Sequence, residues 1–253
     1  MRLEKIKTIR SKLKANDACI GTWQQIPHAS ISEILGQAGF DWVAIDLEHG
    51  AIDNHQLPDL FRAIELGGTL PLARIAESKP KNCKSALDAG AGGIIAPMIT
   101  TSDQLKMVRS ACSWPPVGDR GVGFSRANLF GKNFDDYVYE ARDPLLVAQI
   151  ENILAVDNIS EILTVGGLDA ILIGPYDLSA SMNITAEFEN PLFIQIMKKI
   201  MDACKDFKIP CGYHVVKQDV KLLEQKIKDG YQFIAYSIDA VCLQELKPPE
   251  NIN

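Results

Sequence analysis

Residues 41–50 read DWVAIDLEHG, a short apolar run that ends in carboxylates and a histidine. Side chains alternate between the two faces of a strand. Asp46 and Glu48 therefore point to one side, while the apolar residues around them point to the other. The segment predicts a strand of the core with acidic groups at its carboxyl end.

Seven further short apolar runs, rich in β-branched residues, lie along the chain, and longer segments such as ISEILGQAG and LKMVRSAC separate them. Apolar residues in these longer segments recur at helical spacing. This alternation predicts repeated βα units and one parallel sheet. The eight predicted strands are CIGTWQQ (19–25), DWVAIDL (41–47), LPLARI (70–75), GGIIAPM (92–98), LLVAQIE (145–151), LDAILIG (168–174), IPCGYHV (209–215) and YQFIAYSI (231–238).

Two observations favour a closed barrel over an open doubly wound sheet. No predicted strand is followed by the G-x-G-x-x-G turn of a dinucleotide-binding sheet. Polar residues stand at the carboxyl ends of nearly all eight runs, and in a barrel these ends meet on one face. We therefore predict an α/β fold, a (β/α)8 TIM barrel, formed by residues 1–253 as a single domain, with Asp46 and Glu48 facing the barrel axis.

One long insertion, residues 113–144, follows the fourth βα unit. A segment of this length in a compact domain usually serves as a lid, a binding loop or a subunit contact. We expect it to cover the barrel mouth or to cross to a neighbouring subunit.

The composition is that of an ordinary globular protein: 47% of the 253 residues are hydrophobic, and the formal net charge is −6. No excess of cations is available to neutralise phosphates, so nucleic acid is not an expected partner. The six cysteines form no CxxC pair, which predicts reduced, packed thiols. The charged start lacks the apolar core of a signal peptide, and no run is long enough to span a membrane, so we expect a soluble, cytoplasmic enzyme.

The end of the DWVAIDLEHG run offers acid–base chemistry. His49 lies where the strand meets its loop, and a histidine in that place can act as a general base. The alternative is that Asp46 and Glu48 form a buried pair satisfied by backbone amides. Arg74 ends the third run, where a planar cation can hold a carboxylate or a developing enolate oxygen. Its alternative role is an ion pair with Asp46.

A second group of polar residues fits a metal ion. Adjacent barrel strands place Glu151, at the end of the fifth run, beside Asp177, just past the sixth. Two carboxylates with the neutral Gln149 and open positions suit a hard divalent cation such as Mg²⁺ or Mn²⁺, whereas zinc favours imidazole or thiolate. Asp177 could instead cap the following helix, and both roles can coexist. Trp23 and His214 end the first and seventh runs and are expected at the barrel mouth.

Several motifs, taken together, resemble a known family. They are GTW (21–23), EILGQAGFDWVAIDLEHG (33–50), PPVGDRGVG (115–123), QIEN (149–152), IGPYDLSAS (173–181) and FIAYSID (233–239). In this order they are similar to the metal-dependent, pyruvate-specific class II aldolases of the HpcH/HpaI family. That family includes the 4-hydroxy-2-oxoheptanedioate, 2-dehydro-3-deoxyglucarate and 2-keto-3-deoxyrhamnonate aldolases, and the resemblance covers nearly the whole chain.

The resemblance implies a (β/α)8 barrel assembled as a homo-oligomer, a hexamer or trimer, with the active site close to a subunit interface. It places a divalent ion, Mg²⁺, Mn²⁺ or Co²⁺, on Glu151 and Asp177, and it assigns the base to His49 and enolate stabilisation to Arg74. The backbone around Asp177 is expected to receive the pyruvate carboxylate. With the residues already placed at the mouth, the expected substrate-binding residues are Trp23, Gln149, Gly174, Pro175, Tyr176, Asp177 and His214.

An aspartate that raises the basicity of the family's histidine falls on Asp88. Because Asp88 precedes the fourth strand, it lies at the opposite end of the barrel from His49 and cannot reach it within one chain. Either a neighbouring subunit supplies Asp88, or Asp46 orients the histidine. The aldehyde half departs from the family, since Tyr176 replaces a usually small residue and His214 an aliphatic one. These changes favour a hydroxylated or carboxylated aldehyde.

The implied reaction joins pyruvate and an aldehyde, or cleaves the corresponding 4-hydroxy-2-oxo acid. The ion serves as a Lewis acid, His49 removes a methyl proton directly or through water, and Arg74 stabilises the enolate. One alternative is a lyase for citramalyl-CoA or malyl-CoA thioesters, although the acidic chain shows no basic groove for CoA. The other is a barrel without catalysis that binds a keto acid.

Overall fold

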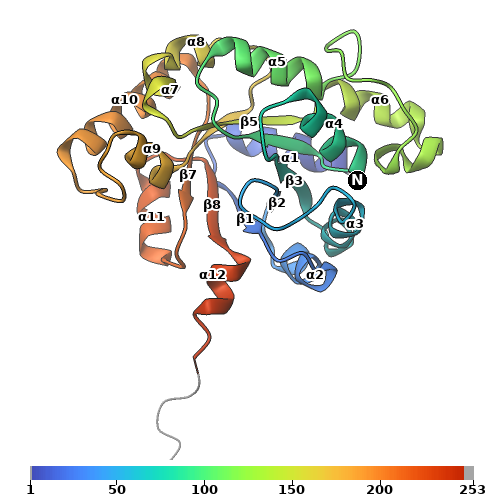
Figure 1. Cartoon of the computed structure of the whole chain (residues 1–253), viewed down its shortest axis with the longest axis horizontal. Helices are drawn as coiled ribbons and strands as arrows, with labels where there is room; N and C mark the ends of the chain where they lie inside the picture. Colours follow the sequence, from blue (N-terminus) through green and yellow to red (C-terminus); the bar gives the residue numbers. More distant parts are fainter. Residues whose placement is uncertain (1, 248–253) are drawn as a thin grey trace, which may run out of the picture.

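In the computed structural model, which describes residues 2–247, eight parallel strands pair in sequence order, and β8 pairs with β1 to close the barrel. Helices surround the strands (Figure 1). The predicted (β/α)8 barrel is confirmed, and each predicted run contains one strand. The predicted domain, residues 1–253, includes residue 1 and residues 248–253, which lie outside the described residues.

The strands are β1 (Cys19–Gln24), β2 (Trp42–Asp46), β3 (Leu70–Arg74), β4 (Gly93–Ala96), β5 (Leu145–Ile150), β6 (Ala170–Ile173), β7 (Cys211–Val215) and β8 (Phe233–Ile238). The helices are α1 (Arg2–Lys14), α2 (Ala29–Gln37), α3 (Leu57–Gly67), α4 (Pro80–Ala89), α5 (Ser102–Cys112), η1 (Arg126–Gly131), α6 (Phe134–Arg142), α7 (Ile153–Asp157), α8 (Ile159–Leu163), α9 (Pro175–Ser181), α10 (Pro191–Phe207), α11 (Val220–Lys228) and α12 (Asp239–Gln244).

Aromatic side chains fill the inside of the barrel. The Trp42 ring stacks on Phe233 with ring centroids 4.6 Å apart, and it meets Trp23 edge-on at 6.0 Å. A Cβ on Gly21 would lie 2.0 Å from the Trp42 ring, so only glycine leaves room for the indole. The interior is therefore a packed core, as in other barrels of this type, and the space for chemistry lies above it.

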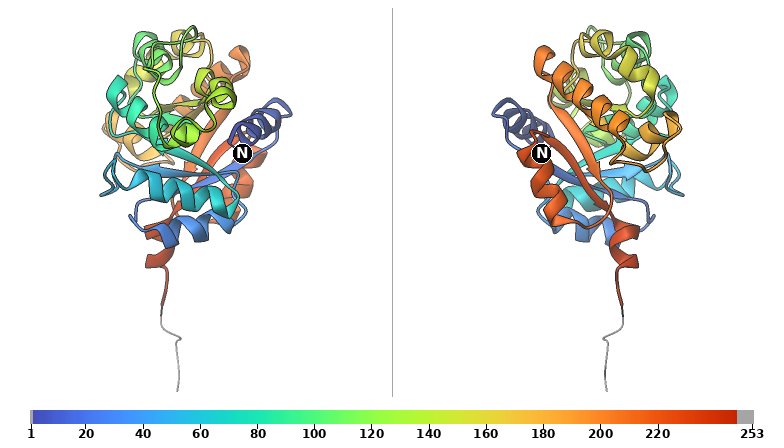
Figure 2. Two further views of the ribbon diagram at one scale, coloured as in Figure 1. Left: turned by 90° about the vertical axis from the view of Figure 1, so that its right-hand side faces the viewer. Right: turned by 90° about the vertical axis from the view of Figure 1, so that its left-hand side faces the viewer.

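Helix α1 closes the amino-terminal end of the barrel. Ile6, Ile9 and Leu13 belong to the same apolar cluster as Leu70 and Leu145, which begin their strands. Figure 2 shows α1 (dark blue) and α12 (red), the helix that follows β8, on opposite sides of the molecule. The carboxyl ends of the strands, where polar residues gather, form the other end.

A second, larger apolar cluster lies between the strands and the surrounding helices. Val43 and Ile45 of β2 belong to this outer cluster, whereas Ala44 belongs to the cluster inside the barrel. Asp46 follows the same alternation as Ala44 and points inward. The period of the strand thus brings the carboxylate to the axis of the barrel while its neighbours pack under the helices.

The insertion, residues 113–144, lies at the amino-terminal end of the barrel and contains η1 and α6. Arg2 of α1 donates hydrogen bonds to Glu140 Oε1 (2.6 Å) and to the Ala127 carbonyl, and Figure 1 shows α6 beside the start of α1. The prediction that the insertion covers the mouth of its own barrel is wrong. It follows α5, which runs back to the amino-terminal end, so it emerges on the opposite face. Contact with a neighbouring subunit stays a prediction.

The six cysteines are free, and all except Cys242 are buried, in agreement with the prediction of packed thiols. Between residues 2 and 247, no helix is both long enough and apolar enough to cross a membrane.

Candidate active site

Asp46 and Arg74, the last residues of β2 and β3, form a buried ion pair at the carboxyl end of the barrel. The two strands pair in a register that sets these residues side by side. Arg74 Nε and Nη2 donate to the two Asp46 carboxylate oxygens at 2.8 and 2.5 Å. Burial alone would raise the pKa of Asp46, but the hydrogen bonds and charge of Arg74 lower it below its usual value. Asp46 is therefore an anion that fixes the guanidinium.

The third nitrogen of the Arg74 guanidinium, Nη1, faces a second carboxylate. Nη1 lies 3.4 Å from Glu48 Oε2, and the guanidinium lies over the Trp23 ring, 4.5 Å from its centroid. A planar cation held by a carboxylate and an aromatic face has little freedom to turn away. Arg74 can therefore form the ion pair with Asp46 and still contact a substrate.

Glu151, directly after β5, is only 2% exposed. Its Oε1 accepts a hydrogen bond from the Met98 backbone N–H at 2.7 Å, and its Oε2 accepts one from Gln149 Nε2. Gly174 lies against the same carboxylate, since a Cβ there would come within 2.6 Å of Glu151 Oε2. Glycine at position 174 is what allows the carboxylate to occupy this place.

The carboxylates of Glu48, Glu151 and Asp177 are close enough to repel one another. Burial raises the pKa of Glu151 to about 7, and the charges of Glu48 and Asp177 add to the increase. Burial likewise raises the pKa of Glu48 to about 7, with further increases from Asp46 and Asp177 that Arg74 opposes. Arg74 does not compensate this negative charge fully, so an added cation would stabilise the ionised carboxylates.

The donor atoms around Glu151 fit a hard divalent cation. Gln149 Oε1 is a buried oxygen without a hydrogen-bond partner among residues 2–247, and Glu48 Oε2 accepts no hydrogen bond there either, its cationic neighbour being Arg74 Nη1 at 3.4 Å. Oxygen ligands of this kind suit Mg²⁺ or Mn²⁺. In that same part of the chain, no three Asp, Glu, His or Cys side chains are arranged around a common point that could hold an ion.

Asp177 lies in the first turn of α9 and is exposed. The helix begins at Pro175, and its N-cap residue is Gly174, which makes no side-chain capping bond. The alternative in which Asp177 caps this helix is therefore wrong. Its carboxylate is free to take part in the cluster with Glu151, and the positive end of the helix dipole favours the charge.

His214 of β7 and Tyr176 of α9 are the residues expected on the aldehyde side, and His214 lies close enough to Arg74 and Asp46 for both charges to affect its pKa. Burial, followed by the positive charge of Arg74, lowers the pKa of His214 to about 3, so the imidazole is neutral at pH 7. Its Nε2 is buried and has no partner within the described residues, and its ring lies 5.6 Å from that of Trp23. Tyr176 is 40% exposed and packs edge-on against Phe188.

His49 and Asp88 lie apart within one chain. His49 is exposed in the loop after β2, and its backbone N–H donates to Asp46 Oδ1 at 3.2 Å. Asp88 lies on α4, just before the amino-terminal end of β4, and is 3.9 Å from Arg120. Asp46 thus holds the backbone of His49 and leaves the direction of the imidazole to other contacts.

Sequence reasoning did not find two groups that support the site. Met98 adopts a positive φ of 51°, and its N–H donates to Glu151; nothing in the sequence marks such a backbone angle. Asp239 accepts hydrogen bonds from the Gln25 and Ile26 N–H groups at 2.8 and 2.9 Å, and Gln25 Nε2 donates to Asp46. An acidic residue directly after the eighth predicted strand was a signal that could have identified Asp239.

The raised pKa values predict how stability changes with pH in protein freed of metal. The pKa of Glu151 is about 7 in the fold against an ordinary value of 4.5, so the folded state holds this proton more tightly than the unfolded state. Its stabilising contribution is present below pH 4.5 and is lost as the pH rises through 7. Between pH 5 and 8 we expect a loss on the order of 1–3 kcal/mol.

Thermal unfolding of the metal-free protein across this pH range measures the effect. Glu151→Gln is neutral at every pH, so its unfolding curves should change less between pH 5 and 8 than those of the wild type. Equal pH dependence in the two proteins would show that Glu151 ionises normally.

In (β/α)8 enzymes, catalytic groups come from the carboxyl ends of several strands. Here polar side chains from β2, β3, β5, β7 and the start of α9 meet at that end, so the fold and the site together define a (β/α)8 enzyme.

Comparison with known proteins identifies the kind of enzyme. The HpcH/HpaI aldolase/citrate lyase family matches residues 20–245. A 2-dehydro-3,6-dideoxy-6-sulfogluconate aldolase of Pseudomonas putida is 35% identical over 232 residues, which cover 90% of this chain and 89% of the relative. A hydroxypyruvate/pyruvate aldolase of Roseobacter denitrificans is 32% identical, with 94% and 93% covered. The crystal structure of a family protein from Burkholderia cenocepacia J2315 superposes with a TM-score of 0.87 at 29% identity, covering 94% of this chain and 95% of that one.

The chain belongs to the HpcH/HpaI aldolase/citrate lyase family. It is an aldolase, a lyase that acts on a carbon–carbon bond, and the family resemblance seen in its motifs is confirmed. Because the relatives at 32–35% identity are aldolases, neither a thioester lyase nor a non-catalytic barrel is favoured.

Proposed function

We propose that this aldolase uses a divalent metal ion to form or cleave a 4-hydroxy-2-oxo acid, with pyruvate and an aldehyde as the other reaction partners. The observation that carries the proposal is the cluster of Glu48, Glu151 and Asp177 beside Arg74. Burial and mutual repulsion raise the pKa of both glutamates to about 7. A cation relieves this repulsion, and the arginine edge adjoining it suits an anionic substrate.

Glu151 and Asp177 would hold the ion, with Mg²⁺ or Mn²⁺ expected and Co²⁺ also able to serve. The chemistry that it supplies when bound is Lewis acidity toward the keto oxygen, which makes the methyl group of pyruvate more acidic. Gln149, whose Oε1 has no partner within residues 2–247, would contact the substrate. The backbone from Gly174 to Asp177 would receive its carboxylate, because α9 begins there and its first N–H groups lack helical partners.

The side chains of this protein would carry the proton and the developing charge. His49 is exposed at the mouth and would take a proton from the pyruvate methyl group. Nη1 of Arg74, which faces Glu48, would stabilise the enolate oxygen, while Asp46 and the Trp23 ring keep the guanidinium in place. In the cleavage direction, a base would take the proton of the 4-hydroxyl group as the C3–C4 bond breaks to give the aldehyde, and His49 would return a proton to the methyl carbon of the enolate.

Asp88 would act on His49 of a neighbouring subunit in a homo-oligomer, a trimer or hexamer. Its distance from its own His49, at the other end of the barrel, supports this assignment. Burial raises the pKa of Asp88 above its usual value, although Arg120 opposes the increase. We also propose that the enzyme acts in the cytoplasm as one catalytic domain.

The test is a set of 4-hydroxy-2-oxo acids assayed for release of pyruvate after chelation and dialysis of the enzyme. Activity should disappear with the metal and return with Mg²⁺, Mn²⁺ or Co²⁺. Borohydride added during turnover should trap no adduct, since no lysine is expected to form a Schiff base. Full activity in the metal-stripped enzyme, or a trapped adduct, would contradict the proposal.

The aldehyde side of the site predicts a preference for hydroxylated acceptors. His214 has a buried Nε2 without a partner in the described residues, and Tyr176 adds a hydroxyl at the rim. A polar site discriminates against analogues that leave its own groups unpaired. We expect kcat/KM for glyceraldehyde to exceed that for butanal by about tenfold or more, and His214→Leu to narrow the ratio. Equal values in the wild type would show that these side chains do not select the acceptor.

A further inference from the structure

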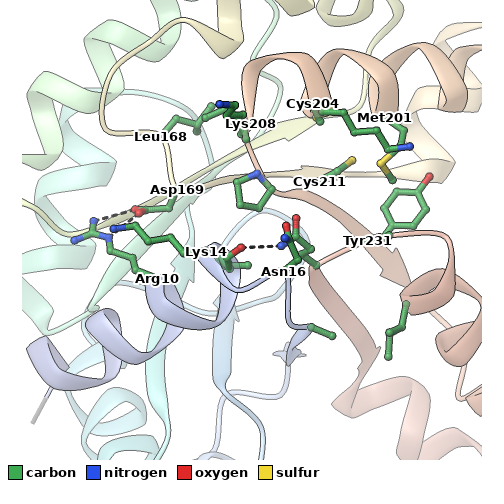
Figure 3. A pocket seen from close by; sticks show the side chains of 18 of the residues that line it. Arg10, Lys14, Asn16, Leu168, Asp169, Met201, Cys204, Lys208, Cys211 and Tyr231 are labelled. Atoms are coloured by element: carbon green, nitrogen blue, oxygen red, sulfur yellow. Dashed lines mark hydrogen bonds and ion pairs between the residues drawn. The ribbon is translucent and has the colours of Figure 1, made fainter.

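A cavity of about 910 Å³ lies at the amino-terminal end of the barrel, the end opposite the candidate active site. Its walls come from the carboxyl-terminal half of α1, the end of α10 and the turn between α11 and β8 (Figure 3). Sites for small organic molecules commonly enclose about 300–1,000 Å³, so the cavity has the size of a ligand site. Neither catalysis nor the packing of the barrel uses this space.

The charges that line the cavity do not cancel. Four cationic and two anionic side chains line it, which leaves a local charge of +2 in a chain whose net charge is −6. Both anionic side chains, Asp143 and Asp169, form ion pairs with Arg10 at 2.6 Å. The three other cations are lysines without an ion pair anywhere in residues 2–247, namely Lys14, Lys205 and Lys208.

The unpaired lysines lie on opposite walls. Lys14 belongs to α1 and Lys208 is the C-cap residue of α10 (Figure 3), and Lys205 lies in the last turn of α10. The lining between the walls includes the buried side chains of Leu168, Met201 and Tyr231. Two cationic ends separated by an apolar surface are complementary to a molecule with an anionic group at each end and an apolar middle.

We propose that this cavity binds an organic dianion, of the α,ω-dicarboxylate type, with one anionic group toward Lys14 and the other toward Lys205 and Lys208. The ligand charge of −2 would match the charge of the lining. The aliphatic stems of the lysines allow their ammonium groups to follow the ligand while the stems cover its apolar middle. Because the site lies at the far end of the barrel, it is independent of the proposed catalytic function.

Isothermal titration of metal-free enzyme with dicarboxylates from malonate to suberate, at low ionic strength, tests the proposal. Butyrate is the monoanionic control. Lys205→Gln/Lys208→Gln and Lys14→Gln each remove charge from one wall, and Lys198→Gln is the matched control, since Lys198 is exposed on α10 outside the cavity lining. These surface variants are expected to unfold at the wild-type temperature.

We expect one dicarboxylate length to bind best, butyrate not to bind, and either wall variant to weaken binding about tenfold or more while Lys198→Gln leaves it unchanged. Added NaCl should weaken binding, as screening requires. Wild-type enzyme that binds no dicarboxylate would overturn the proposal, and so would wall variants that bind as tightly as the wild type. An oligomer that dissociates in the wall variants, without any ligand binding to the wild type, would instead assign the cavity to a second copy of the chain.

Discussion

Replacement of Glu151 with alanine is expected to reduce metal-dependent aldol cleavage by a factor of 10³ or more, within the range of losses seen when a charged catalytic group is removed. Glu151 is buried beside Gln149 and Asp177, and it is one of the two carboxylates proposed to hold the ion. Because only two carboxylates are proposed to hold the metal ion, the loss of either should abolish its tight binding. Asp177→Ala is expected to have the same effect.

Mn²⁺ binding, followed by electron paramagnetic resonance, separates this explanation from a folding defect. Glu151→Gln keeps the size of the side chain, so its unfolding temperature should stay close to that of the wild type while Mn²⁺ binding is lost. Glu161→Gln provides a control, because Glu161 is an exposed acid on α8, outside the proposed ligand set. Wild-type Mn²⁺ affinity in Glu151→Gln would refute the assignment of this ligand.

The barrel could be predicted from the sequence because two features mark the predicted strands, namely an apolar run and a polar residue at its carboxyl end. DWVAIDL shows both an apolar run and a polar residue at its carboxyl end, and Asp46 indeed ends β2. Eight such runs leave few other architectures. The alternative in which the insertion covers the mouth of its own barrel was wrong, because its place after α5 puts it at the other end of the barrel. The element that precedes an insertion decides at which end of the barrel it lies, and the length of the insertion does not.

The candidate site was predictable only in part. Alternation within strands brought Asp46 and Glu151 to the mouth, but the sequence could not choose between the two roles of Arg74, and the structure accommodates both. The contact of Glu151 with the Met98 N–H depends on a backbone angle that no residue pattern encodes. Backbone donors and interatomic distances arise from the packed fold. Sequence motifs therefore identify the residues of the site, but they do not predict the distances and hydrogen bonds between them.

His49→Ala is expected to slow the exchange of the pyruvate methyl protons with solvent by about 10² to 10⁴, the usual contribution of a positioned general base. His49 is exposed in the loop after β2 and holds its place through a backbone bond to Asp46 that alanine retains. The variant should therefore fold, bind Mn²⁺ and bind pyruvate as the wild type does. Only the step that transfers the proton should change.

Deuterium incorporation into pyruvate, followed by proton NMR without any aldehyde, measures that step alone. His55→Ala is the matched control, because His55 is also an exposed histidine and lies six positions along the chain; it should exchange at the wild-type rate. Added imidazole should restore part of the exchange in His49→Ala, since the missing group is a base and no metal ligand has been removed. Exchange at the wild-type rate in His49→Ala would show that another base takes the proton. Two glutamates at this mouth have a pKa of about 7, and Glu48 would then be the candidate, because Glu151 is assigned to the metal ion.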